Sequence, residues 1–551
     1  MDNLSYWRPQ QREKLWDMLE SGKHVWDLVI VGGGVTGAGI LREAVRYGLK
    51  ALLVEKRDFA WGASSKSSKM VHGGLRYLAS GQLSLTRHSV RERQRLLEEA
   101  PGLVEPLNFL MGHYRGEFPP GFIFQRVLDV YDRMAGARNH EAFRPEQAAY
   151  LAPGINAEGL RSLSRFGDAV TDDARLVLKI LRQGVAEGGV AVNYCGAREV
   201  VRVNGRLHGV VLHDAIADRN CEVRARVVVN ATGAWSDQLR MQEGVGAQIR
   251  PLRGSHLVLP QWRLPVAYAV SGFHPDDKRP VFAFPWEGVT VVGTTDLDHT
   301  QDMEQDVSIS AAEMDYLMRG VNHMFPSLGL QPEEIMCTYS GIRPVVSSGA
   351  ADPSKEKREH SIWNDNGLIS VAGGKLTTFR LIALDVLQEA ARYLDGVAFN
   401  ASDARVFANG APPYSQECGV SASVYRRLCG RYGSAGASML EKDKERLRPI
   451  TGTNLLWGEI DHALQNESVV HLDDLMLRRT RLGLLAPNGA EAMLEEIGRR
   501  CQRYLGWSEA VWRDEANRYR NLFQRHFGVP GVTIINNDAA QAQRKTEETG
   551  A

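Results

Sequence analysis

Apolar residues along the chain fall into two patterns: short uninterrupted runs, and the spacing of amphipathic helices. Uninterrupted runs bounded by glycine or polar residues predict buried strands, whereas helical spacing predicts helices that pack one face on a core. The predicted strands span residues 28–31, 51–54, 190–194, 199–203, 209–213, 223–229, 254–259, 281–284, 290–294 and 368–371. The predicted helices are a polar lead-in within 1–23, residues 87–99, 174–184 and 311–324, and a helix that ends near 394.

The order of these elements predicts three regions. A nucleotide-binding fold is expected in three separated segments, 24–105, 170–250 and 340–397. Two insertions are expected to form a substrate domain, 106–169 and 251–339. The second insertion is β-rich, whereas 105–165, rich in aromatic residues and proline, is expected to be irregular. Residues 400–530 show helical patterns and no strand pattern, and the polar stretch 536–551 is expected to be disordered.

The predicted fold class is therefore α/β (α+β overall). It combines a Rossmann-like domain, interleaved with an antiparallel-sheet substrate domain, and a C-terminal helical domain. The Rossmann-like part rests on a Gly-x-Gly-x-x-Gly motif that follows the apolar run 28–31. Gly32 permits a tight turn, Gly34 lets backbone N–H groups approach a pyrophosphate, and Gly37 lets a helix lie close to the sheet.

An acidic residue completes this motif. Glu55 follows the second apolar run, 23 residues after Gly32. A carboxylate at this position can accept hydrogen bonds from ribose hydroxyls. The spacing therefore predicts that the chain binds a dinucleotide, because an ordinary Gly-rich turn would leave Glu55 unexplained.

Charge and cysteine usage exclude several function classes. Lys and Arg together number 66, as do Asp and Glu, so no overall charge points to nucleic acid. The six cysteines are scattered without a C-x-x-C pair, which argues against a metal or iron–sulfur site and fits a reducing cytosol. No export signal and no run of about 18 apolar residues is visible. Peripheral attachment to a membrane stays open.

A second dense region spans residues 64–78. It combines clustered hydroxyls, basic side chains and a Gly-Gly pair just after the second predicted strand. Its candidate binding residues are Ser64, Ser65, His72, Gly73, Arg76 and Tyr77. A polar surface loop is the plainer alternative, but arginine beside histidine favours an anionic ligand.

With these motifs in place, the chain resembles the FAD-dependent, quinone-linked glycerol-3-phosphate dehydrogenases of the D-amino-acid-oxidase-like flavoprotein superfamily. The motifs that carry the resemblance are 32–37 with Glu55, 64–78, 171–176, 229–235, 253–256, 341–344 and 372–377. The strings H-G-G-L-R-Y at 72–77 and G-G-K-L-T at 373–377 are the more specific ones. The helical part, notably 475–481, also resembles that family's C-terminal domain.

The resemblance implies an extended FAD as cofactor. The ADP half would lie on 32–37, and the flavin ring would lie between the 64–74 loop and a helix start at 373–377. That helix start supplies backbone N–H groups and a positive dipole end, which stabilise negative charge on the reduced flavin. The residues assigned to the cofactor are Gly32, Gly34, Gly37, Glu55, Ser64, Ser65, Gly73, Gly233, Gly373, Gly374, Leu376 and Thr377.

The resemblance also implies glycerol 3-phosphate as substrate, oxidised to dihydroxyacetone phosphate by hydride transfer from C2 to flavin N5. The candidates for binding this anion are His72, Arg76, Tyr77, Arg343 and Lys375. Oxidation of the alcohol requires a group that takes or shares the hydroxyl proton. His256 is a candidate base by its near-neutral reference pKa, whereas Arg343 could instead orient the hydroxyl and stabilise the emerging charge. The sequence leaves this choice open.

Only one dinucleotide motif is present, which favours a small-molecule reductant bound at the flavin over NAD(P)H. The resemblance implies ubiquinone or menaquinone as acceptor and a cytoplasmic protein attached peripherally to the inner face of the cell membrane. It leaves a homodimer open. The arginine-rich stretch 478–481 either contacts anionic lipid or packs the helical domain.

Three alternatives to a quinone-linked dehydrogenase remain. An oxidase that forms hydrogen peroxide would keep every motif. A type linked to an iron–sulfur partner would need a cysteine-rich C-terminal region, which Cys418, Cys429 and Cys501 do not supply. A flavin-binding sensor without turnover is disfavoured, because the cationic candidates are retained together.

Overall fold

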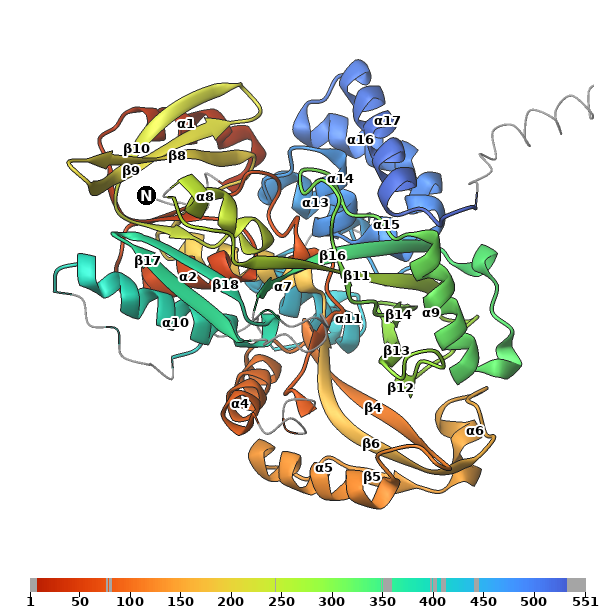
Figure 1. Ribbon diagram of the computed structural model, residues 1–551. Coiled ribbons are helices and arrows are strands. Elements are labelled where there is room, and N and C mark those ends of the chain that lie inside the picture. The colour runs from red at the N-terminus through yellow and green to blue at the C-terminus, as the bar shows by residue number, and fades with distance from the viewer. Residues whose placement is uncertain are drawn as a thin grey trace, which may run out of the picture.

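The computed structural model describes residues 7–75, 78, 82–242, 244–347, 349, 359–396, 399, 404–407, 413–440 and 445–532. Two residues expected in the substrate site, Arg76 and Tyr77, and the polar stretch 536–551 lie outside the described residues. Figure 1 shows two β-sheets with helices packed on both, and the C-terminal helices, in blue, lying together beside them.

The first sheet has eight strands and a parallel centre, in the order β17-β18-β10-β1-β2-β7, with β9 paired to β10 and β8 to β9. Its strands are β1 (Val25–Val31), β2 (Ala51–Val54), β7 (Val190–Val192), β8 (Cys195–Val203), β9 (Arg206–Asp214), β10 (Arg219–Asn230), β17 (His360–Asp365) and β18 (Leu368–Gly373). The pairs β1–β2, β1–β10, β2–β7 and β10–β18 are parallel. Parallel strands are buried on both faces, so they read in the sequence as continuous apolar runs.

Helices cover both faces of this sheet. They are α1 (Arg12–Glu20), α2 (Val35–Arg46), α7 (Asp173–Ala186) and α10 (Phe379–Ala390). Side chains alternate between faces along a strand. Leu28 and Ile30 of β1 accordingly pack in one core with α2, α7 and α10, whereas Val29 packs in another with Leu15 and Trp16 of α1.

The second sheet has ten strands and is mostly antiparallel. Its order is β15-β11-β14-β13-β12-β4-β6-β3, with β16 paired to β11 and β5 to β6. Its strands are β3 (Met70–Val71), β4 (Val104–Tyr114), β5 (Glu141–Phe143), β6 (Leu160–Thr171), β11 (Ile249–Pro260), β12 (Ala269–Phe273), β13 (Pro280–Trp286), β14 (Val289–Gly293), β15 (Leu297–Asp298) and β16 (Cys337–Val346). Leu257 and Leu259 of β11 pack against α9 (Ala311–Met324), whereas Val258 faces the C-terminal helices.

The remaining helices surround these sheets or form the C-terminal region. They are α4 (Leu83–Glu99), α5 (Gly121–Ala135), α6 (Ala148–Leu151), α8 (Ser236–Gln242), α11 (Ala422–Tyr432), α12 (Ser434–Ser438), α13 (Trp457–Asn466), α14 (Leu472–Asp474), α15 (Leu482–Leu485), α16 (Leu494–Leu505) and α17 (Glu509–His526). The predicted fold class, two kinds of sheet followed by C-terminal helices, is confirmed. Among the described residues, no helix combines the length and apolar character that a bilayer span requires.

The expectation that residues 105–165 are irregular is wrong, because they contain α5, β5, α6, most of β4 and the first half of β6. The strand pattern of β6 was hidden by a buried polar residue, Asp168, whose carboxylate pairs with Arg93 of α4 at 2.6 Å. The helical pattern of α5 was present in the buried residues Phe124, Leu128 and Tyr131, but the surrounding prolines and aromatics obscured it.

A buried ion network joins the C-terminal helices to the loop after β2. The Asp58 carboxylate accepts hydrogen bonds from Arg478 and Arg479, which end the π-helical turn η12 (Leu475–Arg479). Two nitrogens of Arg479 lie 2.6 and 2.8 Å from the carboxylate oxygens. Burial alone would raise the pKa of Asp58, but the two guanidiniums outweigh it and hold that pKa below its ordinary value. The cluster 478–481 therefore packs the helical region, because all four of its side chains are buried away from any lipid.

This network predicts a large loss of stability on Arg479→Ala. The substitution removes one guanidinium from a fully buried carboxylate, which typically costs about 3–5 kcal/mol. The matched control is Arg499→Ala, which removes an exposed ion pair of α16 and should leave stability nearly unchanged. The measurement is urea unfolding followed by circular dichroism, and equal unfolding midpoints for the two variants would contradict the assigned role.

Candidate active site

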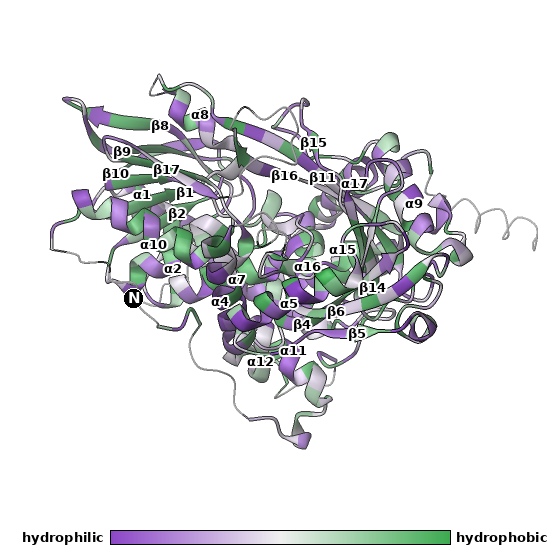
Figure 2. Cartoon of the chain, turned by 60° about the horizontal axis from the view of Figure 1, so that its bottom comes forward, coloured by the Kyte–Doolittle hydropathy of each residue, from purple (hydrophilic) through white to green (hydrophobic). Residues whose placement is uncertain are grey.

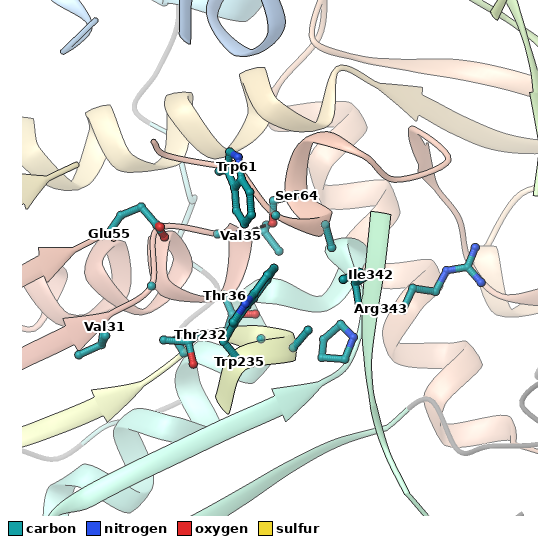
Figure 3. Close-up of a pocket in the computed structure, with 18 of the residues that line it drawn as sticks. Val31, Val35, Thr36, Glu55, Trp61, Ser64, Thr232, Trp235, Ile342 and Arg343 are labelled. Carbon is teal, nitrogen blue, oxygen red and sulfur yellow. Dashed lines mark hydrogen bonds between the residues drawn. The ribbon is translucent and has the colours of Figure 1, made fainter. Parts of the chain in front are cut away.

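A cavity lies at the carboxyl ends of β1 and β10, where the chain order of the first sheet reverses (Figure 3). From β1 the chain continues to β2, which pairs with one side of β1, whereas β10 pairs with the other side of β1. In open α/β sheets such a switch point is where ligands bind. The wall comes from separate segments of the chain, 31–36, 55–64, 231–239, 303–304, 342–345 and 373–376, together with single residues Ser67 and Ala197.

The glycines of the β1–α2 turn are required by close backbone contacts. Gly32 has φ +115°, and a Cβ there would lie 2.5 Å from the Ala231 carbonyl oxygen. A Cβ on Gly37 would lie only 1.9 Å from the Gly32 carbonyl oxygen, so α2 can approach the turn only with glycine here. Gly34 is the N-cap of α2 and lines the cavity, which leaves the start of the helix facing the cavity. A helix start of this kind binds phosphate.

Two side chains complete the turn. Glu55 accepts hydrogen bonds from the Gly33 and Arg57 backbone N–H groups at 2.6 and 2.9 Å, which holds its carboxylate beside the turn. Burial raises the pKa of Glu55, opposed by these two hydrogen bonds. The Ser64 hydroxyl accepts a hydrogen bond from the Val35 N–H at 3.0 Å and also lines the cavity.

The opposite part of the wall comes from β18 and the turn after it. Gly373 and Gly374 have φ +82° and +78°, and both line the cavity with Lys375 and Leu376. The short 3₁₀ helix η9 (Leu376–Thr378) then leads into α10, so another helix start lies at this wall. The Lys375 ammonium donates a hydrogen bond to the Ser89 hydroxyl of α4 at 2.5 Å. Gly233, with φ +62°, lines the wall after β10.

Arg343 reaches the cavity from β16. Its guanidinium pairs with Asp296 at 3.0 Å and donates to the Thr294 hydroxyl at 3.2 Å. Figure 3 shows Arg343 and Glu55 toward opposite ends of the cavity, with Trp61 and Trp235 between them.

His256 lies behind this wall on β11. It is 1% exposed, its Nε2 lies 2.8 Å from the Ser68 hydroxyl, and its ring stacks on Tyr339. Burial, followed by the positive charges of Arg343 and Lys69, holds the pKa of His256 well below its ordinary value. The imidazole is therefore neutral at pH 7, and it can accept a proton only as a weak base.

Several other candidate residues lie next to the cavity without lining it. The Ser65 carbonyl accepts hydrogen bonds from buried Lys69 and Arg481, and the Gly73 N–H donates to Asp168 at 2.9 Å. The Thr377 hydroxyl donates a hydrogen bond to the His72 carbonyl at 3.3 Å. This bond joins the 373–377 motif to the 72–77 motif.

Sequence reasoning missed several residues of the wall, among them Trp61, Trp235, Met303 and Glu304. Trp61 and Trp235 lie with ring centroids 5.5 Å apart, and the Trp235 indole donates to the Met303 carbonyl at 3.0 Å. Glu304 pairs with Lys56 and accepts a hydrogen bond from Gln238. Trp235 belongs to the 229–235 motif, so the sequence could have indicated it as a site residue, whereas no local pattern marks Met303 or Glu304. Among the described residues, no group of three or more His, Cys, Asp or Glu is arranged to hold a metal.

Comparison with known proteins agrees with this geometry. Residues 27–380 match the family model described as FAD dependent oxidoreductase, and residues 401–511 match the C-terminal domain of alpha-glycerophosphate oxidase. The chain is 30% identical to an aerobic glycerol-3-phosphate dehydrogenase of Staphylococcus haemolyticus, over 83% of this chain and 86% of that protein. It is 33% identical to glycerol-3-phosphate dehydrogenase 2 of Mycobacterium tuberculosis, over 92% of this chain and 90% of that protein.

A solved structure extends the similarity to the fold. The glycerol-3-phosphate dehydrogenase from Bacillus halodurans, complexed with FAD, superposes with a TM-score of 0.77 at 27% identity, over 96% of this chain and 100% of that chain. The cavity fits FAD as cofactor: the glycine turn leaves the start of α2 facing the cavity, and backbone N–H groups hold the Glu55 carboxylate beside this turn, where the dinucleotide motif places its ribose ligand. The chain therefore belongs to the FAD-dependent oxidoreductases, in the group that these glycerol-3-phosphate dehydrogenases form.

Proposed function

We propose that the enzyme oxidises sn-glycerol 3-phosphate to dihydroxyacetone phosphate and passes the electrons to a membrane quinone. The observation that carries the substrate assignment is the pair of cations at the cavity wall. Arg343 comes from β16 and Lys375 from the turn after β18, yet both line the cavity that holds the dinucleotide turn. Two cations at one wall suit a phosphate-bearing alcohol better than a neutral one. The names of the relatives support the same substrate.

FAD, when bound, supplies the two-electron acceptor that takes the hydride from C2 of the substrate at N5. The protein's own task is to hold the anion and to accept the hydroxyl proton. Lys375 presents a compact charge with three donors, whereas the guanidinium of Arg343 is planar and can orient an oxygen through two parallel N–H groups. The helix start at Gly374 and Leu376 offers backbone N–H groups to negative charge that develops on the bound cofactor.

Two residues are candidates for this step: one would accept the hydroxyl proton of the substrate, and the other would stabilise the negative charge that develops on the oxygen. His256 is neutral and hydrogen bonded to Ser68, which makes a proton path through the Ser68 hydroxyl geometrically available. Arg343 cannot accept a proton, so its part would be to orient the hydroxyl and stabilise its developing negative charge. We assign the proton to His256 and the charge stabilisation to Arg343.

A glycerol-3-phosphate oxidase, which gives hydrogen peroxide, is the second candidate. The match of residues 401–511 to the C-terminal domain of alpha-glycerophosphate oxidase favours it. Both candidates share the substrate and the cavity, so they differ only in the acceptor that reoxidises the flavin.

An exposed surface near α5 supports a membrane acceptor. Phe118 and Phe122, which flank the start of α5, are 75% and 74% exposed. A groove between α4 and the end of α5 is lined by basic and acidic residues together, among them Arg87, Arg91, Arg133, Glu98 and Glu99. Figure 2 turns this end of the molecule forward and shows hydrophilic and hydrophobic stretches interspersed on α4 and α5. Exposed aromatic side chains at the start of α5 suit insertion into the interface of a bilayer, which supports peripheral docking of this end of the molecule.

The substrate assignment predicts a specific loss on Lys375→Met. Removing one charge-assisted contact to the phosphate is worth about 1.5–3 kcal/mol, so kcat/KM for glycerol 3-phosphate should fall roughly 10- to 150-fold while FAD stays bound. The control is Lys278→Met, which removes an exposed ion pair with Glu117 outside the cavity lining and should leave kcat/KM unchanged. Phosphate-free glycerol should be a comparably poor substrate of the unsubstituted enzyme, and equal turnover of glycerol and glycerol 3-phosphate would remove phosphate from the substrate class.

The acceptor assignment predicts how the reduced enzyme is reoxidised. Stopped-flow mixing with a ubiquinone analogue in anionic vesicles should reoxidise the flavin faster than air-saturated buffer does. Phe122→Glu should slow the reaction with vesicles, because a carboxylate opposes docking, but not the reaction with oxygen. The control is Ile216→Glu, at the exposed β9–β10 turn, which should change neither rate. Faster reoxidation by oxygen with stoichiometric peroxide would make the enzyme an oxidase.

A further inference from the structure

A buried carboxylate, Asp296, sits between two arginines beside the active-site cavity. One carboxylate oxygen lies 3.0 Å from the Arg343 guanidinium, and the other lies 3.3 Å from that of Arg279. The Asp296 side chain is 1% exposed, whereas the two arginine side chains are 26% and 30% exposed. The carboxylate of Asp296 therefore lies between the two guanidiniums, and its contact with Arg343 is the closer one.

The guanidinium of Arg343 is also confined on its other sides. The Thr294 hydroxyl oxygen accepts a hydrogen bond from the Arg343 guanidinium at 3.2 Å. Gly254 of β11 lies directly beneath it: a Cβ at Gly254 would come within 2.7 Å of the Arg343 Nη2 atom and 3.0 Å of the Thr294 hydroxyl oxygen. The absence of a side chain at Gly254 therefore lets the guanidinium lie against the sheet, and Asp296 fixes its direction there.

The segment that carries Asp296 is held in place by hydrogen bonds of the preceding residue, Thr295. The neighbouring Thr295 hydroxyl donates to the Glu313 carboxylate at 2.8 Å and accepts from the Ser255 N–H at 2.9 Å. Glu313 is buried in the first turn of α9 and also accepts from the Ser255 hydroxyl at 2.8 Å. The segment that carries Asp296 is thus fastened to α9 and to β11 at the residue that precedes His256.

We propose that Asp296 is a positioning residue that orients the Arg343 guanidinium toward the reacting hydroxyl, and this proposal rests on the proposed function. The contacts with Asp296 and Thr294 hold two different nitrogens of the Arg343 guanidinium, which fixes the plane of the group at the cavity wall. Without the carboxylate, the long side chain would regain rotamer freedom and swing in the cavity. Misplacement of a catalytic group by about 1 Å can cost on the order of 100-fold in rate.

The test compares Asp296→Asn with Asp298→Asn. Asp298 lies two residues further along the same segment and pairs with exposed Arg250 at 2.6 Å, so it reports the cost of removing a carboxylate from this segment alone. Each variant is purified with FAD and mixed anaerobically with glycerol 3-phosphate in a stopped-flow instrument. The limiting rate of flavin reduction should fall about 10- to 100-fold in D296N and less than about twofold in D298N.

A second readout separates positioning from general damage. FAD content and the thermal unfolding midpoint should be the same in D296N and D298N. Binding of dihydroxyacetone phosphate to the oxidised enzyme, followed by the perturbation of the flavin spectrum, should weaken only in D296N. If D296N does not fold, Thr294→Val decides, because it removes the other contact of the guanidinium with little change in volume and should lower the reduction rate several-fold.

The outcomes distinguish the two claims. An unsubstituted enzyme that glycerol 3-phosphate does not reduce would overturn the proposed function. The role of Asp296 alone would be overturned if the unsubstituted enzyme is reduced and D296N is reduced at the rate of D298N. If D296N is unfolded, reduction of T294V at the rate of D298N would overturn it.

Discussion

The structure depends on buried carboxylates that are each matched by more than one cation. Asp58 is paired with Arg478 and Arg479, and Asp173 accepts hydrogen bonds from Lys69 and Arg481. A charge without a partner in the interior would cost several kcal/mol, so these pairs hold only when the C-terminal helices are docked on the nucleotide-binding sheet. The loop after β2 and the loop before β3, both adjacent to the cavity, are thereby fixed from behind by residues of the last quarter of the chain.

The same arrangement recurs at the substrate end of the cavity. Asp296 neutralises part of the charge of two arginines, and Glu313 holds the segment that carries it. Glu55, at the dinucleotide end, is different, because backbone N–H groups rather than cations satisfy it. Backbone partners leave its remaining lone pairs available to ribose hydroxyls.

Local sequence patterns predicted the parts of the fold whose cause is local. The parallel strands β1 and β2 read as continuous apolar runs because both of their faces are buried, and Gly37 is required by the carbonyl of Gly32 in the same turn. Strand β6 was missed because the buried Asp168 is explained only by Arg93, 75 residues away in the chain. The same holds for Met303 and Asp296, whose place at the cavity depends on long-range pairing that no local pattern encodes.

The central claim is that glycerol 3-phosphate delivers its hydride to the FAD of this protein. Anaerobic titration of the purified yellow protein with glycerol 3-phosphate, followed by flavin absorbance, tests it most directly. We expect the flavin to bleach with a stoichiometric yield of dihydroxyacetone phosphate, and NADH to leave the absorbance unchanged. A flavin that stays oxidised with glycerol 3-phosphate, or one that NADH bleaches, would contradict the account.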